Sequence, residues 1–324
     1  MQGFSLIEPR DVTSAIAAAS APGAKYIAGG TDLLQLTKDN IETPDRLIDL
    51  QGLPAASIEA SADRLRLEPL ALMSDVAAHP DVLARWPVLS QALLASASPQ
   101  IRNMATMGGN LLQRTRCGYF RDTAFACNKR VPGSGCPAIS GENRMLAILG
   151  GSDHCIATYP GDMAVALMAL NGKVELTGPN GKRTVEIEEF YLVPGSTPHI
   201  ETVLTAGEMI TGIEVPASAA AQRSYYLKVR DRASFEFAVV SAAVALDLDG
   251  KTVRGVRVAA GGVGTKPWRL PEVETALAGK TVEPATLRSA AEQAGAGAKA
   301  ASMNGFKLVL LRRAVLRALQ TVSA

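Results

Sequence analysis

The sequence is poor in aromatic residues and in net charge. Aromatic residues make up 5% of its 324 residues, although 47% of the chain is hydrophobic. The formal net charge is +2, so no strong electrostatic field favours nucleic acid or a membrane surface. No run of about 18 uncharged apolar residues is present, which excludes a membrane-spanning helix. The composition predicts a compact protein in which many small residues pack into two or three units.

Three familiar sequence signals are also missing. The segment Met1–Pro9 has no cationic run followed by an apolar stretch, so it does not predict a signal peptide. No GxGxxG motif follows a predicted strand, so a nicotinamide-binding fold is not expected. The cysteines form no CxxC pair, which is unlike a structural zinc site, and their spacing differs from that of a ferredoxin. Taken by itself, the chain is predicted to be cytoplasmic.

A glycine pair marks the first predicted site. Residues 24–28 predict a strand that runs into Gly29 and Gly30, and residues 33–38 predict a short helix before a second strand at 46–50. Paired glycines let backbone N–H groups approach an anion, and a helix that begins just after them adds a positive dipole end. The loop is either a phosphate cradle or an ordinary strand–helix turn.

A second glycine pair, Gly108 and Gly109, follows a helix predicted at 83–96. Thr106 and Asn110 flank the pair, and their side chains can hydrogen-bond a phosphate, a ribityl chain or each other. Two such loops in one domain favour a dinucleotide site over two unrelated turns.

All the cysteines lie between Cys117 and Cys155, with Cys127 and Cys136 between them. The loop between the thiols is rich in glycine, proline and asparagine and can bend round a bulky guest. Nearby cations lower the pKa of thiols and offset the negative charge of a cluster. The basic residues beside the thiols are Arg114, Arg116, Arg121, Lys129 and Arg130. Spacing alone leaves three interpretations open: an iron–sulfur cluster, two disulfides, or four separate buried thiols.

The rest of the chain predicts an α+β protein in two parts. A helix is expected to begin at Asp162, where a carboxylate is a usual N-cap. A linker predicted at 216–221 separates a domain at residues 1–217 from a second at 218–324. Other predicted elements include strands at 64–70, 145–150, 154–158, 174–176, 184–187 and 209–215 and helices at 284–295 and 303–321. Residues 224–229 and 239–246 are predicted to be two strands, or a strand and a buried segment.

Four pieces of sequence resemble the FAD-binding medium subunits of the molybdenum hydroxylases, which include xanthine dehydrogenase, carbon monoxide dehydrogenase and 4-hydroxybenzoyl-CoA reductase. The pieces are residues 28–33 (AGGTDL), 105–111 (ATMGGNL), 162–164 (DMA) and the segment around Lys228. The resemblance covers nearly the whole chain. It implies a two-part FAD-binding domain of the vanillyl-alcohol-oxidase (PCMH) type, followed by a small C-terminal domain with an antiparallel sheet and helices.

Longer strings resemble one branch of this family, the flavin subunits of bacterial periplasmic aldehyde oxidoreductases. They are residues 112–117 (LQRTRC), 127–136 (CNKRVPGSGC) and 228–234 (KVRDRAS). In that branch an insertion, here at about 112–156, carries a [4Fe-4S] cluster. The resemblance implies that the cluster ligands are Cys117, Cys127, Cys136 and Cys155.

The resemblance also implies which residues hold FAD. The two glycine loops are expected to hold its diphosphate and ribityl groups, and Asp162 and Lys228 lie where the family contacts the flavin. If the resemblance is set aside, Lys228 is a single basic residue in a predicted strand, and such a residue more often faces solvent than a ligand. The expected FAD ligands are Tyr26, Ile27, Ala28, Gly29, Gly30, Thr31, Asp32, Leu33, Leu34, Thr106, Gly109, Asn110, Asp162 and Lys228.

These expectations describe an electron-transfer subunit. A large partner subunit oxidises an aldehyde to a carboxylic acid at a molybdenum cofactor. A small partner subunit with [2Fe-2S] clusters then passes the electrons to FAD on this chain, which delivers them to an external acceptor. No side chain of this chain needs to act as acid, base or nucleophile, because the cofactor carries the redox chemistry. The [4Fe-4S] cluster is either a relay or a structural anchor.

Two competing functions and the location stay open at this point. A stand-alone flavoprotein oxidase with its own substrate pocket is disfavoured, because the histidines His79, His154 and His199 are scattered along the chain. An assembly protein without flavin is the third interpretation. The family exports its complex on a partner's signal, which implies a periplasmic location; without such a partner the chain is expected in the cytoplasm.

Overall fold

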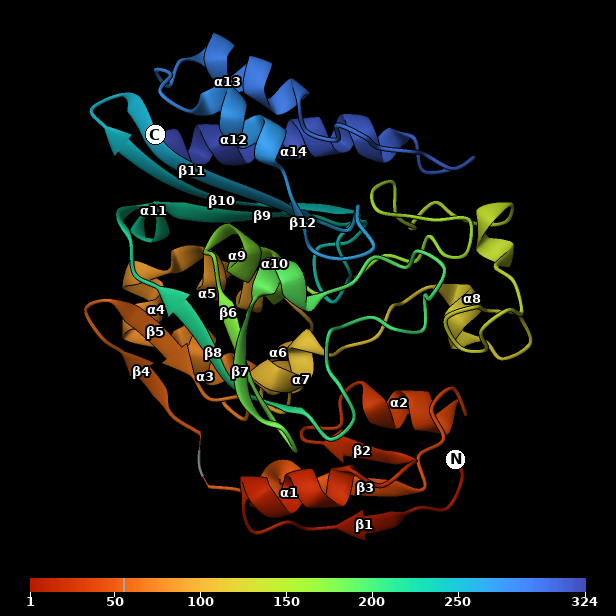
Figure 1. Ribbon diagram of the computed structural model, residues 1–324. Coiled ribbons are helices and arrows are strands. Elements are labelled where there is room, and N and C mark those ends of the chain that lie inside the picture. The colour runs from red at the N-terminus through yellow and green to blue at the C-terminus, as the bar shows by residue number, and fades with distance from the viewer. Residues whose placement is uncertain (55) are drawn as a thin grey trace.

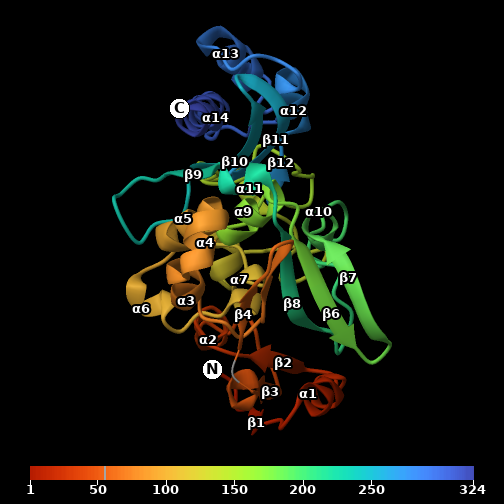
Figure 2. The same cartoon turned by 90° about the vertical axis from the view of Figure 1, so that its left-hand side faces the viewer.

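A computed structural model of the protein describes residues 1–54 and 56–324. Three sheets with their helices are stacked in chain order, with the N-terminal sheet at one end and the C-terminal helices at the other (Figure 1). The same stacking is seen after a turn of 90° (Figure 2). None of the described helices is long and apolar enough to cross a membrane.

The N-terminal layer is a three-stranded parallel sheet in the order β1-β3-β2. Parallel neighbours need crossover connections, and two short helices supply them. Its elements are β1 (Ser5–Ile7), α1 (Val12–Ala19), β2 (Ala24–Ile27), α2 (Leu33–Lys38) and β3 (Arg46–Asp49). The first glycine loop is the β2–α2 connection, as the sequence predicts.

The second layer is a five-stranded antiparallel sheet in the order β4-β5-β8-β6-β7, with helices packed against it. Alternate strand residues such as Val174, Leu176 and Ile213 are buried in a core shared with these helices. The strands are β4 (Ile58–Ala60), β5 (Arg64–Leu67), β6 (Lys173–Gly178), β7 (Gly181–Glu186) and β8 (Met209–Pro216). The helices are α3 (Met73–Ala78), α4 (Pro80–Arg85), α5 (Pro87–Ala95), α6 (Pro99–Arg102), α7 (Met107–Leu111), α9 (Met163–Ala169) and α10 (Ile187–Phe190).

The single helix predicted at 83–96 is wrong, since the chain forms α4 and α5 instead. Trp86 leaves the helical conformation, at φ −136° and ψ 53°, and Pro87 begins the next helix. A residue before proline is driven out of the helical region by the proline ring, which explains the break.

The third layer is a four-stranded antiparallel sheet in the order β12-β11-β10-β9. Its elements are α11 (Ala219–Gln222), β9 (Ser224–Val229), β10 (Val240–Asp249), β11 (Thr252–Gly261), β12 (Trp268–Arg269), α12 (Pro271–Leu277), α13 (Pro284–Glu292) and α14 (Phe306–Ser323). Side chains alternate along β9: Tyr225 and Leu227 pack in the core that includes α14, whereas Tyr226 packs in the core of the second layer. Lys228 therefore faces the second layer and not solvent.

The cysteine segment lies to one side of the stack and contains only short helical turns, α8 (Gly118–Arg121) and η2 (Pro137–Ile139) (Figure 1). The strands predicted at 145–150 and 154–158 are wrong, because these residues form only isolated bridges. The buried side chains of residues 145–150 are apolar, as in a strand. Their backbone carbonyls, however, accept hydrogen bonds from side chains in the C-terminal part of the chain. Asn304 Nδ2 donates to the carbonyls of Leu146 and Ala147, and Lys307 Nζ donates to Leu146 O at 3.1 Å.

Candidate functional site

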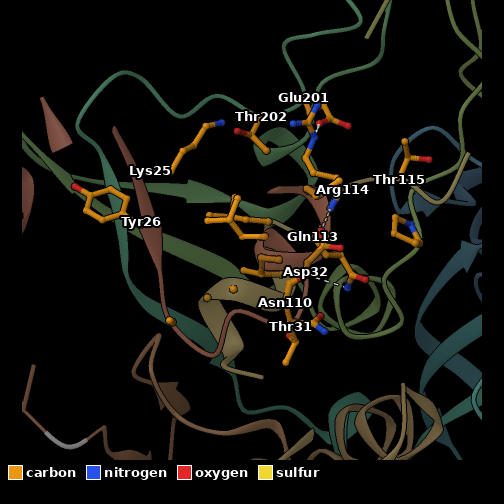
Figure 3. Close-up of a pocket in the computed structure, with 18 of the residues that line it drawn as sticks. Lys25, Tyr26, Thr31, Asp32, Asn110, Gln113, Arg114, Thr115, Glu201 and Thr202 are labelled. Atoms are coloured by element: carbon orange, nitrogen blue, oxygen red, sulfur yellow. Dashed lines mark hydrogen bonds and ion pairs between the residues drawn. The ribbon is translucent and has the colours of Figure 1, made fainter. Parts of the chain in front are cut away.

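A cavity of about 900 Å³ is lined by residues of all three layers. This volume lies within the range of small-molecule and cofactor sites. Figure 3 shows Thr31, Asp32, Asn110 and Gln113 along its wall. The cavity is lined by both glycine loops and extends to Lys228 on β9.

The first glycine loop presents free backbone donors to this cavity. Within the described chain, the N–H groups of Gly29, Gly30, Thr31 and Asp32 donate to no backbone or side-chain acceptor. Gly30 has φ +69°, a conformation that residues with a Cβ rarely adopt. Successive N–H groups in such a turn form a concave anion site. The loop is therefore built to receive a phosphate.

A close contact joins the two glycine loops. A Cβ built on Gly29 would lie 1.8 Å from the backbone oxygen of Met104, which precedes the second loop. Only glycine fits at this point, because the obstacle is backbone and cannot rotate away. The glycine sets the spacing between the two walls of the cavity.

The second glycine loop contributes differently. Its N–H groups are already used: Gly108 N donates to Pro69 O at 2.8 Å, and Gly109 N donates to the Thr106 hydroxyl at 3.3 Å as part of the α7 N-cap. The buried Asn110 Oδ1, however, accepts no hydrogen bond within residues 1–54 and 56–324. A buried polar atom without a partner is costly, so this oxygen points to a ligand that donates to it. The free N–H donors of the first loop and the free acceptor of Asn110 thus fit a dinucleotide that carries phosphate and hydroxyl groups.

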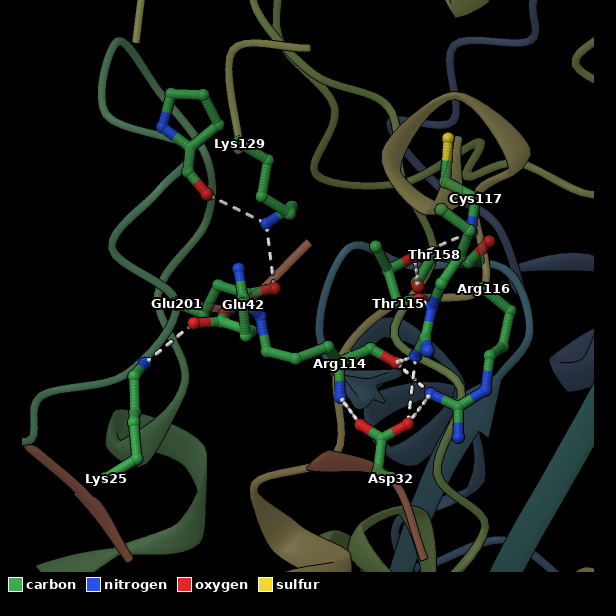
Figure 4. A network of polar contacts seen from close by, with 12 residues as sticks. Lys25, Asp32, Glu42, Arg114, Thr115, Arg116, Cys117, Lys129, Thr158 and Glu201 are labelled. Carbon is green, nitrogen blue, oxygen red and sulfur yellow. Dashed lines mark hydrogen bonds and ion pairs between the residues drawn. The ribbon is translucent and has the colours of Figure 1, made fainter. Parts of the chain in front are cut away.

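Asp32 has a role that the sequence did not reveal. Its carboxylate pairs with Arg116 at 3.0 Å and Arg121 at 2.9 Å, and it accepts from Arg114 N at 2.7 Å (Figure 4). The side chain therefore ties the first glycine loop to the cysteine segment. Burial lowers the pKa of Arg116 to about 10, and the charge of Asp32 opposes that shift.

Arg114 extends this ionic network along the cavity wall. It pairs with Glu42 and Glu201, and Glu201 also pairs with Lys129 Nζ at 2.8 Å (Figure 4). Lys25 pairs with Glu42 at 3.2 Å. Sequence reasoning grouped Arg114 and Lys129 with the thiols and missed Glu42 and Glu201, because they come from distant segments.

A buried ion pair closes the other end of the cavity. Lys228 Nζ lies 2.8 Å from Asp162 Oδ2, and their side chains are 4% and 5% exposed. Asp162 was expected to cap α9, but within the described chain its carboxylate makes no capping bond and pairs with Lys228 instead. The exposed-lysine alternative for Lys228 is wrong, since the pleat of β9 turns this side chain inward.

All the FAD ligands expected from the resemblance except Leu34 line the cavity. Leu34 is the second residue of α2 and its side chain is 37% exposed. Neighbouring residues of a helix project in different directions, so Leu33 faces the cavity and Leu34 does not. The sequence also missed Tyr159 and Tyr191, whose hydroxyls lie 2.9 Å apart on the cavity wall.

The four cysteines line one small pocket together with Tyr119, Phe120 and Lys129. All four are free thiols, so the two-disulfide alternative is wrong for this structure. Burial raises the pKa of Cys155 to about 11 and that of Cys117 above its ordinary value. These thiols stay protonated at neutral pH unless a metal centre supplies positive charge.

The thiol pocket does not have the geometry of a single-ion site. Among the described residues, no three Cys, His, Asp or Glu side chains are placed to hold one metal ion. The four thiolates of a [4Fe-4S] cluster each bind a different iron, so they stand further apart than the ligands of a single ion. The pocket shares Lys129, Cys155 and Ala157 with the large cavity, so one layer of residues separates the two.

A second ion pair supports the turn at residues 205–208, which also lines the cavity. Glu208 accepts from Arg183 Nε and Nη2, each at 2.7 Å, and from Thr205 N at 2.8 Å. Tyr26 OH donates to Gly207 O at 3.0 Å and so fastens the turn to β2. The Arg183 guanidinium lowers the pKa of Glu208 to about 2.

Replacing Arg183 with alanine is expected to lower stability by about 1 kcal/mol at pH 7, because the pair is partly solvent-exposed. The pKa of Glu208 is about 2 in the folded protein and near 4.5 when unfolded. Its contribution is therefore complete above pH 4.5 and is lost as the pH falls towards 2. Urea unfolding of both proteins should show a difference that narrows from pH 7 to pH 3. Lys182→Ala, which removes an exposed neighbour, is the control, and an equal difference at both pH values would contradict the assignment.

Comparison with known proteins shows which family the chain belongs to and which cofactor that family binds. A family model for the FAD binding domain in molybdopterin dehydrogenase matches residues 2–218, and one for the CO dehydrogenase flavoprotein C-terminal domain matches residues 225–322. The chain belongs to the FAD-binding subunits of the molybdenum hydroxylases. The predicted resemblance is thereby confirmed, and with it the α+β fold of an FAD-binding domain followed by a C-terminal domain.

Relatives of this subunit cover almost its full length. It is 46% identical over 313 residues to the aldehyde oxidoreductase FAD-binding subunit PaoB of Escherichia coli (strain K12), which covers 96% of this chain and 95% of the relative. It is 28% identical to the carbon monoxide dehydrogenase medium chain of Hydrogenophaga pseudoflava, covering 90% and 85%. A solved carbon monoxide dehydrogenase from Hydrogenophaga pseudoflava matches with a TM-score of 0.76 and 26% identity, covering 98% of this chain and 96% of that one. The protein is an oxidoreductase subunit that binds FAD.

Proposed function

We propose that this chain is the electron-transfer subunit of a heterotrimeric, molybdenum-dependent aldehyde oxidoreductase. The observation that carries the proposal is the single cavity in which free backbone donors, the Asn110 oxygen and the buried Lys228 converge. The 46% identity to an aldehyde oxidoreductase subunit supports aldehydes as the substrate class of the complex. The substrate itself reacts on a partner, so this chain needs no substrate pocket of its own.

In the proposed complex, three subunits share one oxidation reaction. A large subunit with a molybdenum cofactor converts RCHO and water into RCOOH, two electrons and two protons. The electrons pass through [2Fe-2S] clusters on a small subunit to this chain and leave to an external acceptor. FAD supplies a two-electron carrier when it is bound here.

The residues of this chain bind and orient that carrier. The N–H groups of residues 29–32 would hold the diphosphate, and Asn110 Oδ1 would accept from a hydroxyl of the dinucleotide. Lys228, which pairs with Asp162, would place a cation next to the flavin. A fixed cation stabilises negative charge that builds up on its neighbour.

We also propose that the segment at about 112–156 is an insertion that holds a [4Fe-4S] cluster. The support is that Cys117, Cys127, Cys136 and Cys155 line one pocket although no two of them are neighbours in the sequence. Lys129 lines this pocket, and its charge opposes the rise that burial causes in the pKa of Cys155. A cluster in this pocket would lie one layer of residues from the FAD site, which suits a relay. We place the complex in the periplasm, exported on a partner's signal, as the resemblance implies.

One experiment tests the function and the cluster together. The chain is co-expressed with its partner subunits, and FAD, iron and molybdenum are counted in the purified complex. Anaerobic addition of an aldehyde is expected to bleach the flavin absorbance, whereas the isolated chain should not turn over aldehyde. Turnover by the isolated chain would favour a stand-alone oxidase, and a colourless complex would favour an assembly protein.

Replacing Cys136 with serine extends this experiment to the cluster. The variant is expected to lose about four irons per complex and to keep its FAD, because the thiol is a ligand only of the cluster. Ser134→Ala, in the same loop, serves as the control and should keep all its iron. An unchanged iron count in the cysteine variant would reject the cluster, and full-rate flavin reduction without it would reject the relay.

A further inference from the structure

We propose that Tyr226 and Ser96 are positioning residues that set the electron affinity of the bound flavin by holding the Asp162–Lys228 pair in one orientation. The proposal rests on the proposed function in one respect, namely that the flavin end of FAD lies at Lys228. Neither residue was singled out by the sequence. Tyr226 does not line the cavity and acts through Asp162, whereas Ser96 lines the cavity and also contacts Asp162.

Three side chains contact the carboxylate oxygens of Asp162. Tyr226 OH donates to Oδ1 at 2.6 Å. Ser96 Oγ lies 2.9 Å from Oδ2 and 2.8 Å from Ala92 O, so its one hydrogen is shared between these two acceptors. Lys228 Nζ donates to Oδ2 at 2.8 Å. Short bonds to a charged acceptor are strong, and together they fix the plane of the carboxylate. The position of the lysine ammonium follows from that plane.

The network joins two layers of the molecule. Tyr226 and Lys228 are two residues apart on β9, so they share the face that lies against the second layer. Ser96 directly follows α5, and Asp162 directly precedes α9, both in the second layer. Gln91 of α5 also accepts from Tyr226 N at 2.8 Å, which pins the strand at the same residue. The C-terminal sheet therefore cannot shift without moving the ammonium.

Lys228 has one donor left for a ligand. Its ammonium carries three N–H groups, and within the described chain two of them go to Asp162 and to Ala95 O at 3.1 Å. The lysine lines the large cavity, whereas Tyr226 does not. Phe235 and Phe237 line the cavity as well, and they give it aromatic side chains that suit a flat ring.

The hydroxyl of Tyr226 remains a donor at every working pH. Burial raises the pKa of Tyr226 well above its ordinary value, and the charge of Asp162 acts in the same direction. The tyrosine therefore withdraws negative charge from the carboxylate permanently. Without it, the carboxylate charge is less neutralised and the cavity beside Lys228 becomes more negative, so the flavin should accept electrons less readily.

The test is a potentiometric titration of the flavin in the co-expressed complex with the variant Tyr226→Phe. The equilibrium constant for two-electron reduction is expected to fall about tenfold, which corresponds to a midpoint potential about 30 mV lower. A chemical reductant is used, so the result does not depend on aldehyde turnover. Ser96→Ala removes a different donor from the same carboxylate and should lower the potential in the same direction.

The neighbouring Tyr225 provides the control. Its side chain lies on the opposite face of β9, so Tyr225→Phe should leave the potential unchanged. A potential like that of the wild type in both Tyr226→Phe and Ser96→Ala, at normal FAD content, overturns the proposal and leaves these residues a purely structural role. If Tyr226→Phe does not fold, Ser96→Ala decides alone. A wild-type complex whose flavin is not reduced by aldehyde counts against the proposed function and not against this inference.

Discussion

Replacing Asp162 with alanine is expected to destabilise the protein by about 3–5 kcal/mol, the largest effect of any single change proposed here. The substitution leaves the Lys228 ammonium buried, with a side chain only 4% exposed, and without its counter-charge. An unpaired charge in a buried site costs far more than the pair itself contributes. The change also removes the acceptor of Tyr226 and Ser96. Urea unfolding of the wild type and variant at pH 7 measures the loss.

An exposed ion pair in the same protein serves as the comparison. Arg144 and Asp231 lie 2.8 Å apart, as close as the buried pair, but their side chains are 43% and 53% exposed. Asp231→Ala is expected to cost less than about 1 kcal/mol, since water screens and replaces the lost contact. Adding Lys228→Met to Asp162→Ala should restore part of the stability, because the uncompensated charge is then removed. Equal losses in Asp162→Ala and Asp231→Ala would show that burial of the pair has no energetic role.

Replacing Gly29 with alanine is expected to reduce FAD affinity by at least about a hundredfold, which is about 2.7 kcal/mol of binding free energy. The new Cβ would lie 1.8 Å from Met104 O and 2.7 Å from the adjoining carbonyl carbon, so the two glycine loops must move apart. Such a movement separates the N–H groups of the first loop from Asn110 on the second. Fluorescence titration of the FAD-free protein with FAD measures the affinity.

Gly52 is the matched control for this change. It has no positive φ, and the nearest atom to an added Cβ is Pro9 O at 3.9 Å. Gly52→Ala should therefore bind FAD like the wild type. If Gly29→Ala also binds FAD at wild-type strength and its melting temperature is unchanged, the close contact between the loops does not shape the site.

Some parts of the site could be predicted from sequence because they are local. The strand–glycine–helix pattern around Gly29 and Gly30 predicts a turn, because the conformation of a turn depends mainly on the few residues that form it. The clustering of the cysteines was also visible, although spacing alone did not separate a cluster from disulfides.

Other parts could not be predicted because they depend on partners far along the chain. Asp32 was expected to face the nucleotide, yet its carboxylate pairs with Arg116 and Arg121 in the cysteine segment. Local pattern alone gave Asp162 as a helix cap, and the resemblance gave it as a flavin contact; neither revealed that its carboxylate binds Tyr226 and Lys228, 64 and 66 residues away. Local pattern cannot tell which of several charges a carboxylate will meet.

By itself, the sequence determined the glycine loops, the alternation of strand residues and the crowding of the thiols, since each follows from the covalent order of neighbouring residues. The tertiary structure alone decided that the two loops meet at Gly29 and Met104 and that the clustered cysteines line one pocket as free thiols. It also decided that Lys228 is buried against Asp162. Ion pairing and burial depend on distances in space, and folding brings together side chains that the order of the chain keeps apart.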